Sequence, residues 1–445
     1  MRKIFAAFLA GSLALCLTGC VFESKPVSVQ DEVVSASEPV IDAEPETDLV
    51  TEEKIEEKEE EKVEKVEEVT LETAEVIKVS VKPRELPESE ALEFVKAMGA
   101  GFNLGNTFDS TSGADNRDKL SYETAWGNPK TTKENIQGLK AAGFQTIRIP
   151  VSWHNHVDKD FKIDVEWMDR VEEVVKWALD EDMYVILNIH HDNEKAFMYP
   201  SYECLDNSLK YVTTIWEQIA ERFGDYDEHL VFESLNEPRL KDTPYEWYVE
   251  LSSPEGKETI DCVNKLNQAA VDAIRRAPGE YNKKRFITVP GYCASPDFVV
   301  PGHFVIPEDP EAEGENRILI TVHAYRPYGF ALSGNKEEIT DKFNLVTSGS
   351  ELNGMFMKLY LDYIQNGTGV IIDEFGAVNR NGNTQARANF AAYFTANARN
   401  YGISVCWWDN GAFTGSGELF GIYRRSTDKV EFPEIVKQIV YYGNN

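Results

Sequence analysis

Two short segments of the chain end in carboxylic acids at positions where such groups could do chemistry. The segment ESLNEP contains Asn236 and Glu237, and VIIDEFG contains Asp373 and Glu374. Each acid follows a run of apolar, β-branched residues, which is typical of a buried parallel strand that delivers a side chain to the rim of a sheet. Paired acids at strand ends suggest the cleavage of sugars.

The first residues have the pattern of an export signal. Arg2 and Lys3 precede an apolar stretch at 4–17 that is too short to span a bilayer as a mature helix. The stretch ends in LTGC, which resembles the lipobox of bacterial lipoproteins. We expect a signal peptide over 1–19 and a lipidated Cys20, with an ordinary secretory signal as the alternative. The protein would then be exported, and either lipid-anchored at the bacterial cell surface or secreted.

After Cys20, residues 20–87 have the composition of an acidic, disordered linker. Between 21 and 90 the chain is poor in aromatics and holds about 23 acidic against about 8 basic residues. Such a segment cannot bury enough apolar surface to offset the entropy of ordering. Roughly half of the net charge of −31 falls there. The acidity of the whole chain is therefore due more to this linker than to the rest of the sequence. The balance argues against nucleic acid as a partner.

Residues 88–445 are long enough for one large domain with a well-buried core. Strand-like and helical segments alternate along it, which predicts an α/β fold of the (β/α)₈ TIM barrel type. An open doubly wound sheet is less favoured because the Gly-rich phosphate-binding turn is missing after the first strand. The expected strands are 101–104, 146–149, 184–189, 230–235, 286–289, 318–322, 370–373 and 403–407. The expected helices are 133–142, 165–180, 211–223, 259–277, 353–366 and 385–401.

In such a barrel the chemistry lies at the carboxyl ends of the strands. Polar and aromatic residues end almost every expected strand, and buried charges without a function are rare and costly. The expected catalytic and substrate-binding residues are Asn103, Arg148, His190, His191, Asn236, Glu237, His323, Tyr325, Glu374 and Trp408.

At these positions the chain resembles glycoside hydrolase family 5, in the clan whose acid/base closes strand four and whose nucleophile closes strand seven. The collinear order of the motifs makes the resemblance specific, and it looks most like subfamily 4, which is dominated by endo-β-1,4-glucanases and xyloglucan-cleaving relatives. The motifs are GFNLGNTFD, GFQTIRIPVSW, VILNIHHD, FESLNEPR, ITVHAY, IIDEFG and CWWDNG.

The resemblance implies a retaining double displacement. Glu374 would attack the anomeric carbon, while Glu237 would protonate the departing oxygen and then deprotonate water. The two carboxyls would lie about 5 to 5.5 Å apart. Glu374 must be ionised while Glu237 is protonated, and Arg148 is the candidate cation. His323 would tune Glu237, and Tyr325 would orient Glu374.

The same resemblance assigns the contacts to the sugar in subsite −1. Asn236 would hold the 2-hydroxyl and His190 another hydroxyl. Trp408 would form the platform below the ring, since an aromatic face complements the C–H face of a pyranose. Only one of Trp407 and Trp408 can face the cleft if the strand alternates, and the match to WDNG favours Trp408.

Other interpretations stay open for some of these residues. His190, His191 and His323 could be metal ligands, as in amidohydrolase-like barrels, but the expected HxH on the first strand is absent. The proposed chemistry requires no metal and no cofactor. Asp373 is expected to point away from Glu374 and to be a structural acceptor.

Aromatic residues in the long loops are candidates for sugar-stacking subsites, although about half could simply pack the loops. These are Trp126, Trp153, Trp247 and Tyr328. Four cysteines remain after export and allow three disulfide pairings, with free buried thiols as the alternative. They are Cys204, Cys262, Cys293 and Cys406.

The loops at 109–129, 238–258 and 325–350 would shape an open cleft, which suits internal attack on a polymer. We expect a monomeric endo-β-1,4-glucanase (cellulase) acting on β-glucan. Mixed-linkage glucan or xyloglucan are the close rivals, and mannan is less favoured. The alternative from another class is a surface lipoprotein that captures polysaccharide without cleaving it.

Overall fold

The computed structural model of the chain describes residues 69–112 and 118–445, and eight parallel strands in this part close into a barrel. Each strand pairs with the next along the chain, and β8 returns to pair with β1. The predicted (β/α)₈ fold and all eight predicted strands are confirmed. The strands are β1 (Ala100–Leu104), β2 (Thr146–Ile149), β3 (Tyr184–Asn188), β4 (Leu230–Glu233), β5 (Ile287–Pro290), β6 (Ile318–His323), β7 (Val370–Phe375) and β8 (Ile403–Asp409).

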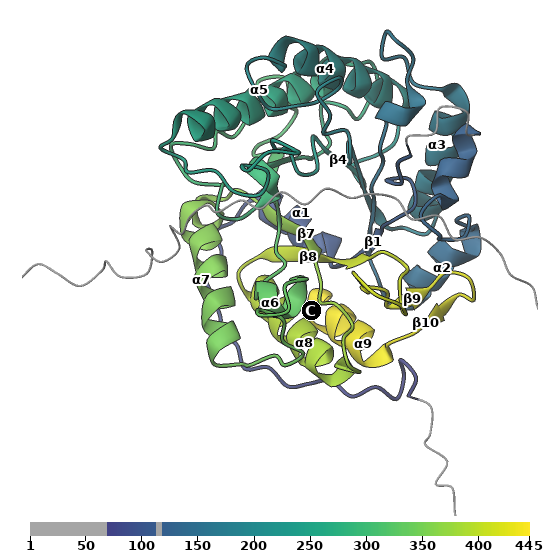
Figure 1. The fold of residues 1–445 in the computed structure, drawn as a ribbon, viewed down its shortest axis with the longest axis vertical. Helices are drawn as coiled ribbons and strands as arrows, with labels where there is room; N and C mark the ends of the chain where they lie inside the picture. Colours follow the sequence, from purple (N-terminus) through teal and green to yellow (C-terminus); the bar gives the residue numbers. More distant parts are fainter. Residues whose placement is uncertain (1–68, 113–117) are drawn as a thin grey trace, which may run out of the picture. The chain divides into compact units, whose positions relative to one another are not determined.

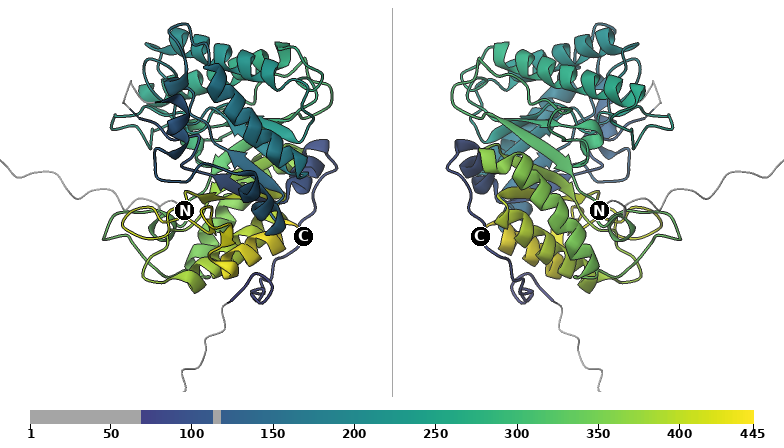
Figure 2. Two further views of the ribbon diagram at one scale, coloured as in Figure 1. Left: turned by 90° about the vertical axis from the view of Figure 1, so that its right-hand side faces the viewer. Right: turned by 90° about the vertical axis from the view of Figure 1, so that its left-hand side faces the viewer.

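Helices surround the barrel on its outer side (Figures 1 and 2). Six of them match the predicted helices, with α4 beginning before its predicted start at 211, whereas α1, α6 and α9 are additional. A short two-stranded sheet, β9 (Tyr423–Arg424) and β10 (Lys429–Val430), follows the barrel. The helices are α1 (Glu90–Met98), α2 (Lys133–Ala141), α3 (Val165–Asp180), α4 (Leu205–Arg222), α5 (Pro254–Arg276), α6 (Tyr328–Ala331), α7 (Thr347–Asp362), α8 (Thr384–Asn400) and α9 (Pro433–Gly443).

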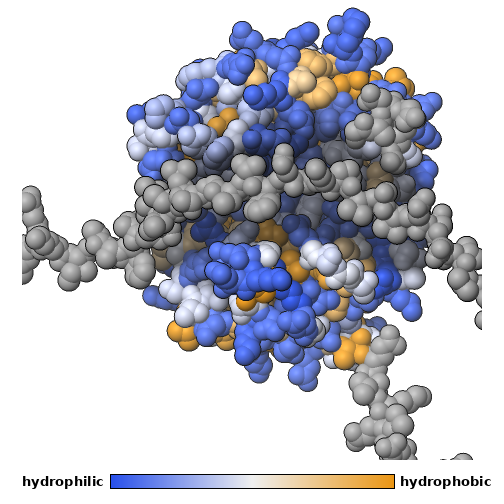
Figure 3. Space-filling view, in the orientation of Figure 1, coloured by the Kyte–Doolittle hydropathy of each residue, from blue (hydrophilic) through white to orange (hydrophobic). Residues whose placement is uncertain are grey.

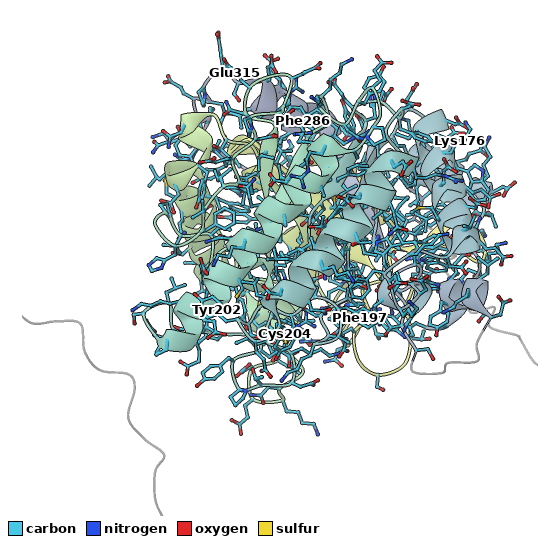
Figure 4. All side chains as sticks on the ribbon, turned by 90° about the horizontal axis from the view of Figure 1, so that it is seen from above. Lys176, Phe197, Tyr202, Cys204, Phe286 and Glu315 are labelled. Atoms are coloured by element: carbon cyan, nitrogen blue, oxygen red, sulfur yellow. The ribbon has the colours of Figure 1, made fainter. Side chains whose placement is uncertain are left out.

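The longest helix, α5, shows how the local sequence defines an element. The Ser253 hydroxyl accepts a hydrogen bond from the Gly256 amide at 2.9 Å, and Pro254 occupies the first turn, where its missing N–H costs nothing. Its apolar residues recur at helical spacing, so that one face is buried. In this way α5 packs beside α4 on the outside of the barrel (Figure 4).

The amino-terminal end of the barrel is filled and closed by apolar side chains. Val95 and Met98 of α1 pack with interior residues such as Val231 and Ile371. Gly101 lies so close to Cys406 that a Cβ at this position would stand 2.1 Å from the Cys406 sulfur. Because this end is a dry, packed layer, the polar residues of the interior gather at the opposite end, where the strands terminate.

Residues 69–87 lie against the barrel, although they belong to the predicted linker. The Ile77 amide donates to Gln438 Oε1 at 2.9 Å, and the Val79 amide donates to the Tyr442 hydroxyl at 3.0 Å. The predicted linker boundary at 87 is therefore too late. Leu71 and Ile77 of this stretch pack against the hydrophobic core, and the acidic composition around them hides this in the sequence.

The predicted signal peptide at 1–19 and the anchor Cys20 lie outside the described residues. Within 69–112 and 118–445, no helix is long and apolar enough to cross a membrane. None of the three possible disulfide pairings forms. The free thiols are Cys204, Cys262, Cys293 and Cys406, of which Cys204 lies where α4 begins (Figure 4).

One buried histidine ties the stability of the fold to pH. The His156 ring stacks on Trp167 of α3 with centroids 3.6 Å apart and an interplanar angle of 2°. Burial lowers the pKa of His156 to about 2, so the fold holds the ring neutral. The unfolded chain would protonate it below a pKa of about 6.5. The stabilising contribution is therefore complete above that pH and is lost as the pH falls toward the folded value.

We expect His156→Phe to keep the aromatic stack and to remove this acid sensitivity. Between about pH 7.5 and pH 5, the free energy of unfolding of the wild type should fall by about 2 kcal/mol more than that of H156F. Urea denaturation at both pH values measures the difference. The exposed His303, replaced by Asn, serves as the control and should follow the wild type. Equal pH dependence in H156F and wild type would contradict the assignment.

Candidate active site

A cleft of about 2080 Å³ lies over the carboxyl ends of the strands. Most of the predicted site residues line it, namely His190, His191, Asn236, Glu237, His323, Tyr325, Glu374 and Trp408. Asn103 and Arg148 were also predicted to bind substrate, but both are fully buried and neither lines the cleft. Their burial does not support direct contact with a substrate, and Arg148 instead hydrogen-bonds to Asn103 and to residues of the cleft.

The buried guanidinium of Arg148 connects four strands beneath the cleft. Its Nη1 donates to Glu374 Oε1 at 2.7 Å and to Asn103 Oδ1 at 2.9 Å. Its Nη2 donates to Asn236 Oδ1 at 2.7 Å. Its Nε and Nη2 form a fork onto Glu233, at 2.6 and 2.7 Å. The Asn236 amide nitrogen is thus left to face the cleft, and the Glu374 carboxylate has a fixed cation.

Glu233 is a functional residue that the sequence analysis missed. Burial raises its pKa, while the fork from Arg148 favours the ionised carboxylate. Its signal in the sequence is a charged residue inside the largely apolar run at 230–235, since a buried charge requires a partner. Asn188 was also missed; it donates to Glu233 Oε1 at 3.2 Å and lies 3.0 Å from His190 Nδ1.

Asp373 is oriented differently from the expectation, because β7 is not a regular strand. The pairing of β7 with β8 shifts register between Ile372 and Phe375, which is the mark of a β-bulge. As a result Asp373 does not point away from Glu374. Its carboxylate lies 3.4 Å from Arg148 Nε and 3.4 Å from His323 Nε2. Burial disfavours the charge, but these two cations lower the pKa of Asp373 to about 2.

The Glu237 and Glu374 carboxylates face each other across His323. His323 Nδ1 lies 2.8 Å from Glu237 Oε1 and 3.4 Å from Glu374 Oε2. An oxygen of each carboxylate lies within 4.8 Å of the other. The Tyr325 hydroxyl donates to Glu374 Oε2 at 2.8 Å. Glu374 is therefore held from below by Arg148 and from the side by Tyr325.

The pKa shifts of the two acids run opposite to the expected order. Burial acts to raise the pKa of Glu237, but the hydrogen bond from His323 and the charge of Arg239 outweigh it and lower that pKa. Burial raises the pKa of Glu374 against the charges of His323 and Arg148. Burial opposes protonation of His323 as well, yet Glu374 and the hydrogen-bonded acids raise its pKa well above the usual range. These pKa directions favour the proton on the imidazole rather than on Glu237.

Two flat side chains form the base of the cleft. The rings of His190 and Trp408 are nearly parallel, with centroids 5.8 Å apart and an interplanar angle of 3°. Burial lowers the pKa of His190 well below its usual value, so the ring is neutral. Because the Asn188 amide donates to Nδ1, the proton of His190 is on Nε2 and can be donated to a hydroxyl. Trp407 is fully buried, so Trp408 is the tryptophan that faces the cleft.

The loop aromatics divide between cleft and core. Trp126, Trp247 and Tyr328 line the cleft and expose 41%, 60% and 54% of their surface. Trp153 is fully buried and donates from its indole nitrogen to the Asn188 carbonyl at 2.9 Å. The visible face of the molecule is mostly hydrophilic (Figure 3).

The histidines considered as metal ligands do not form one cluster in the described part of the chain. His190 and His191 gather with Asp109, whereas His323 gathers with carboxylates. The His323 ring nitrogens face Glu237, Glu374 and Asp373. These contacts are those of a proton-binding imidazole between acids.

Comparisons with known proteins agree on one family. The family model of cellulase, glycosyl hydrolase family 5, matches residues 109–414. Endoglucanase A of Clostridium longisporum is 40% identical over 375 residues, which are 82% of this chain and 68% of that protein. A GH5-4 broad specificity endoglucanase from Clostridium acetobutylicum has a TM-score of 0.70 and 38% identity, covering 80% of this chain and 100% of that chain.

A family 5 lichenase from Caldicellulosiruptor sp. F32 has a TM-score of 0.81 and 46% identity, and covers 83% of this chain and 100% of that chain. A glutamate-to-glutamine mutant of the same lichenase, solved in complex with cellotetraose, has a TM-score of 0.81 and 45% identity over the same shares. Since the family match extends from before β2 to beyond β8, the chain belongs to glycosyl hydrolase family 5, the cellulase family.

Proposed function

We infer that this chain is a retaining endo-β-1,4-glucanase that hydrolyses cellulose, mixed-linkage β-glucan or xyloglucan. The relatives are named as endoglucanases and a lichenase. The observation that carries the mechanism is the approach of the Glu237 and Glu374 carboxylates, with oxygens within 4.8 Å of each other. A retaining site needs carboxyls about 5 to 5.5 Å apart, whereas an inverting site needs about 6.5 to 9.5 Å to admit a water.

In the first step, Glu374 Oε attacks the anomeric carbon and the bond to the glycosidic oxygen breaks. Glu237 gives its proton to that oxygen, and a glycosyl-enzyme ester forms on Glu374. The hydrogen bonds from Arg148 and Tyr325 hold the attacking carboxylate in a single orientation. Such preorganisation removes the cost of arranging the nucleophile during the reaction.

In the second step, the ionised Glu237 takes a proton from water, and the hydroxide attacks the anomeric carbon. The ester bond to Glu374 breaks, and the sugar leaves with its original configuration. His323 bonds both carboxylates. It can therefore supply the proton that Glu237 gives to the leaving oxygen in the first step, because ester formation consumes the charge on Glu374 and the imidazolium loses its strongest partner. Glu237 is then ionised and ready to act as the base in the second step.

The cleft supports binding of a flat, neutral polymer at an internal position. The Asn236 amide nitrogen and the neutral His190 provide hydrogen-bond donors for hydroxyls, and Trp408 lies below them as an aromatic platform. Trp126 and Trp247 line the same cleft. An open cleft with several stacking surfaces favours endo-cleavage over removal of terminal sugars.

We also propose that the protein is exported and held at the cell surface by a lipid on Cys20. The support is the sequence alone, in the charged start, the short apolar stretch and LTGC. The acidic segment after Cys20 would act as a tether for a monomeric enzyme. One acyl anchor makes the protein peripheral rather than membrane-spanning.

Replacement of Glu374 by Gln should abolish turnover and preserve binding. We expect the release of reducing sugars from β-1,4-glucan and mixed-linkage glucan to fall by about 10⁴-fold or more, with affinity for cellotetraose retained in calorimetry. The wild type should cleave these glucans faster than mannan. A wild type without turnover would favour the capture protein, and cleavage of mannan or xylan alone would contradict the glucanase.

Glu237→Ala should affect substrates according to their leaving groups. On glucan, which needs protonation of the departing oxygen, the rate should fall by about 10² to 10⁴-fold. On a dinitrophenyl cellobioside the first step should be spared, so that a burst of phenol precedes slow turnover. Rapid-mixing absorbance measures the burst. Equal losses on both substrates would exclude Glu237 as the acid.

Cys20→Ser should move the protein from the membrane fraction to the soluble fraction of a bacterial host that lipidates exported proteins. The loss follows from removal of the only thiol in the lipobox position. Cys16→Ser, four residues earlier in the apolar stretch, is the matched control and should stay with the membrane. Cell fractionation and immunoblotting measure the share of each variant in the membrane fraction. If C20S stays in the membrane fraction as the wild type does, the lipid anchor on Cys20 is disproved.

A further inference from the structure

The Glu237 carboxylate has a second cation, which the mechanism above does not use. His323 Nδ1 holds Oε1 at 2.8 Å, and Arg239 Nη1 lies 3.3 Å from Oε2. The same Arg239 nitrogen donates to the backbone carbonyl of Glu237 at 3.1 Å. Each oxygen of the acid/base therefore has its own positively charged partner, one from β6 and one from the loop after β4.

Arg239 is itself held in place by two neighbours on the same loop. Its Nε donates to Glu246 Oε1 at 3.2 Å, and its guanidinium lies over the Trp247 ring at 4.4 Å from the centroid. Only 11% of the Arg239 side chain is exposed. An arginine fixed by a carboxylate and an aromatic face is a rigid group rather than a mobile surface cation.

Trp247 places this unit beside the path of the substrate. It lines the cleft and leaves 60% of its surface exposed, although one face is occupied by Arg239. The sugar platform Trp408 stacks with His190, whereas Trp247 contacts the arginine that holds the acid/base. The exposed part of Trp247 is thus available to the sugar that departs with the oxygen protonated by Glu237.

We propose that Arg239 is a positioning residue that acts through Glu237, orienting the acid/base and linking it, through Trp247, to the sugar on the leaving-group side. The proposal rests on the proposed function, because it presupposes that Glu237 is the acid/base. Arg239 has no assigned role in the two chemical steps themselves.

The sign of its effect on Glu237 follows from the charges around that carboxylate. The groups facing it are His191 after β3, Cys293 after β5, His323 from β6, Tyr325 after β6, Glu374 from β7, Glu418 after β8, and Arg239. A cation near Oε2 favours the ionised form, so its removal makes Glu237 a weaker acid. Glu246 opposes the Arg239 charge, so its neutralisation makes Glu237 a stronger acid.

The pH profile of kcat/KM tests the proposal, because its alkaline limb reports loss of the proton that Glu237 and His323 share in the free enzyme, and the Arg239 charge favours that loss. In Arg239→Gln we expect this limb to move to higher pH by about one unit. In Glu246→Gln it should move to lower pH, because Arg239 is then unopposed. Arg239→Lys keeps the charge and should leave the limb close to that of the wild type. A residue with a purely structural role would not shift the limb in opposite directions in R239Q and E246Q.

A second readout separates positioning from folding. R239Q should lose about tenfold in kcat on mixed-linkage glucan and little on a dinitrophenyl cellobioside, which needs little protonation. An unmoved alkaline limb in both R239Q and E246Q, or equal losses on both substrates, would overturn the proposal while the wild type still cleaves glucan. If R239Q does not fold, the E246Q and R239K profiles decide alone. Failure of the wild type to cleave glucan would instead overturn the proposed function.

Discussion

The guanidinium of Arg148 lies in the barrel interior without access to solvent, and residues on three other strands or strand ends accept its hydrogen bonds. A buried charge that loses its partner costs about 3 to 5 kcal/mol. Removal of one charged group would therefore destabilise the others of this cluster, which consists of Arg148, Glu233, Asp373 and Glu374. Only a closed barrel brings strands so distant in the chain to one point. The position of Glu374 therefore depends both on the closed barrel and on this charge arrangement.

The acids above this arrangement share protons with His323 rather than holding fixed protonation states. The raised pKa of His323 and the lowered pKa of Glu237 favour the proton on the imidazole. A double displacement needs the same carboxyl to be an acid in one step and a base in the next. A neighbouring imidazole that contacts both carboxylates suits this alternation, because formation of the glycosyl ester on Glu374 removes one of the charges that hold the proton on the ring.

Most of the barrel could be predicted because its strands are buried on both faces and read as apolar runs, each ending in a polar residue. The misses have physical causes. The bulge in β7 breaks the alternation on which the placement of Asp373 relied. Glu233 is the last residue of β4, but the expected strand ran on to residue 235, so a search of the expected strand ends passed over it. Residues 69–87 look disordered by composition, yet a few apolar contacts and hydrogen bonds to α9 order them.

The central claim is that Glu237 and Glu374 are close enough for one of them to bond to the sugar. The configuration of the first product tests this directly, because a covalent intermediate inverts the anomeric carbon twice and a direct attack by water inverts it once. Proton NMR of cellotetraose during the first minutes of hydrolysis resolves the newly formed reducing end before it mutarotates. The account predicts that the β-anomer appears first and the α-anomer follows by mutarotation. Appearance of the α-anomer first would contradict it.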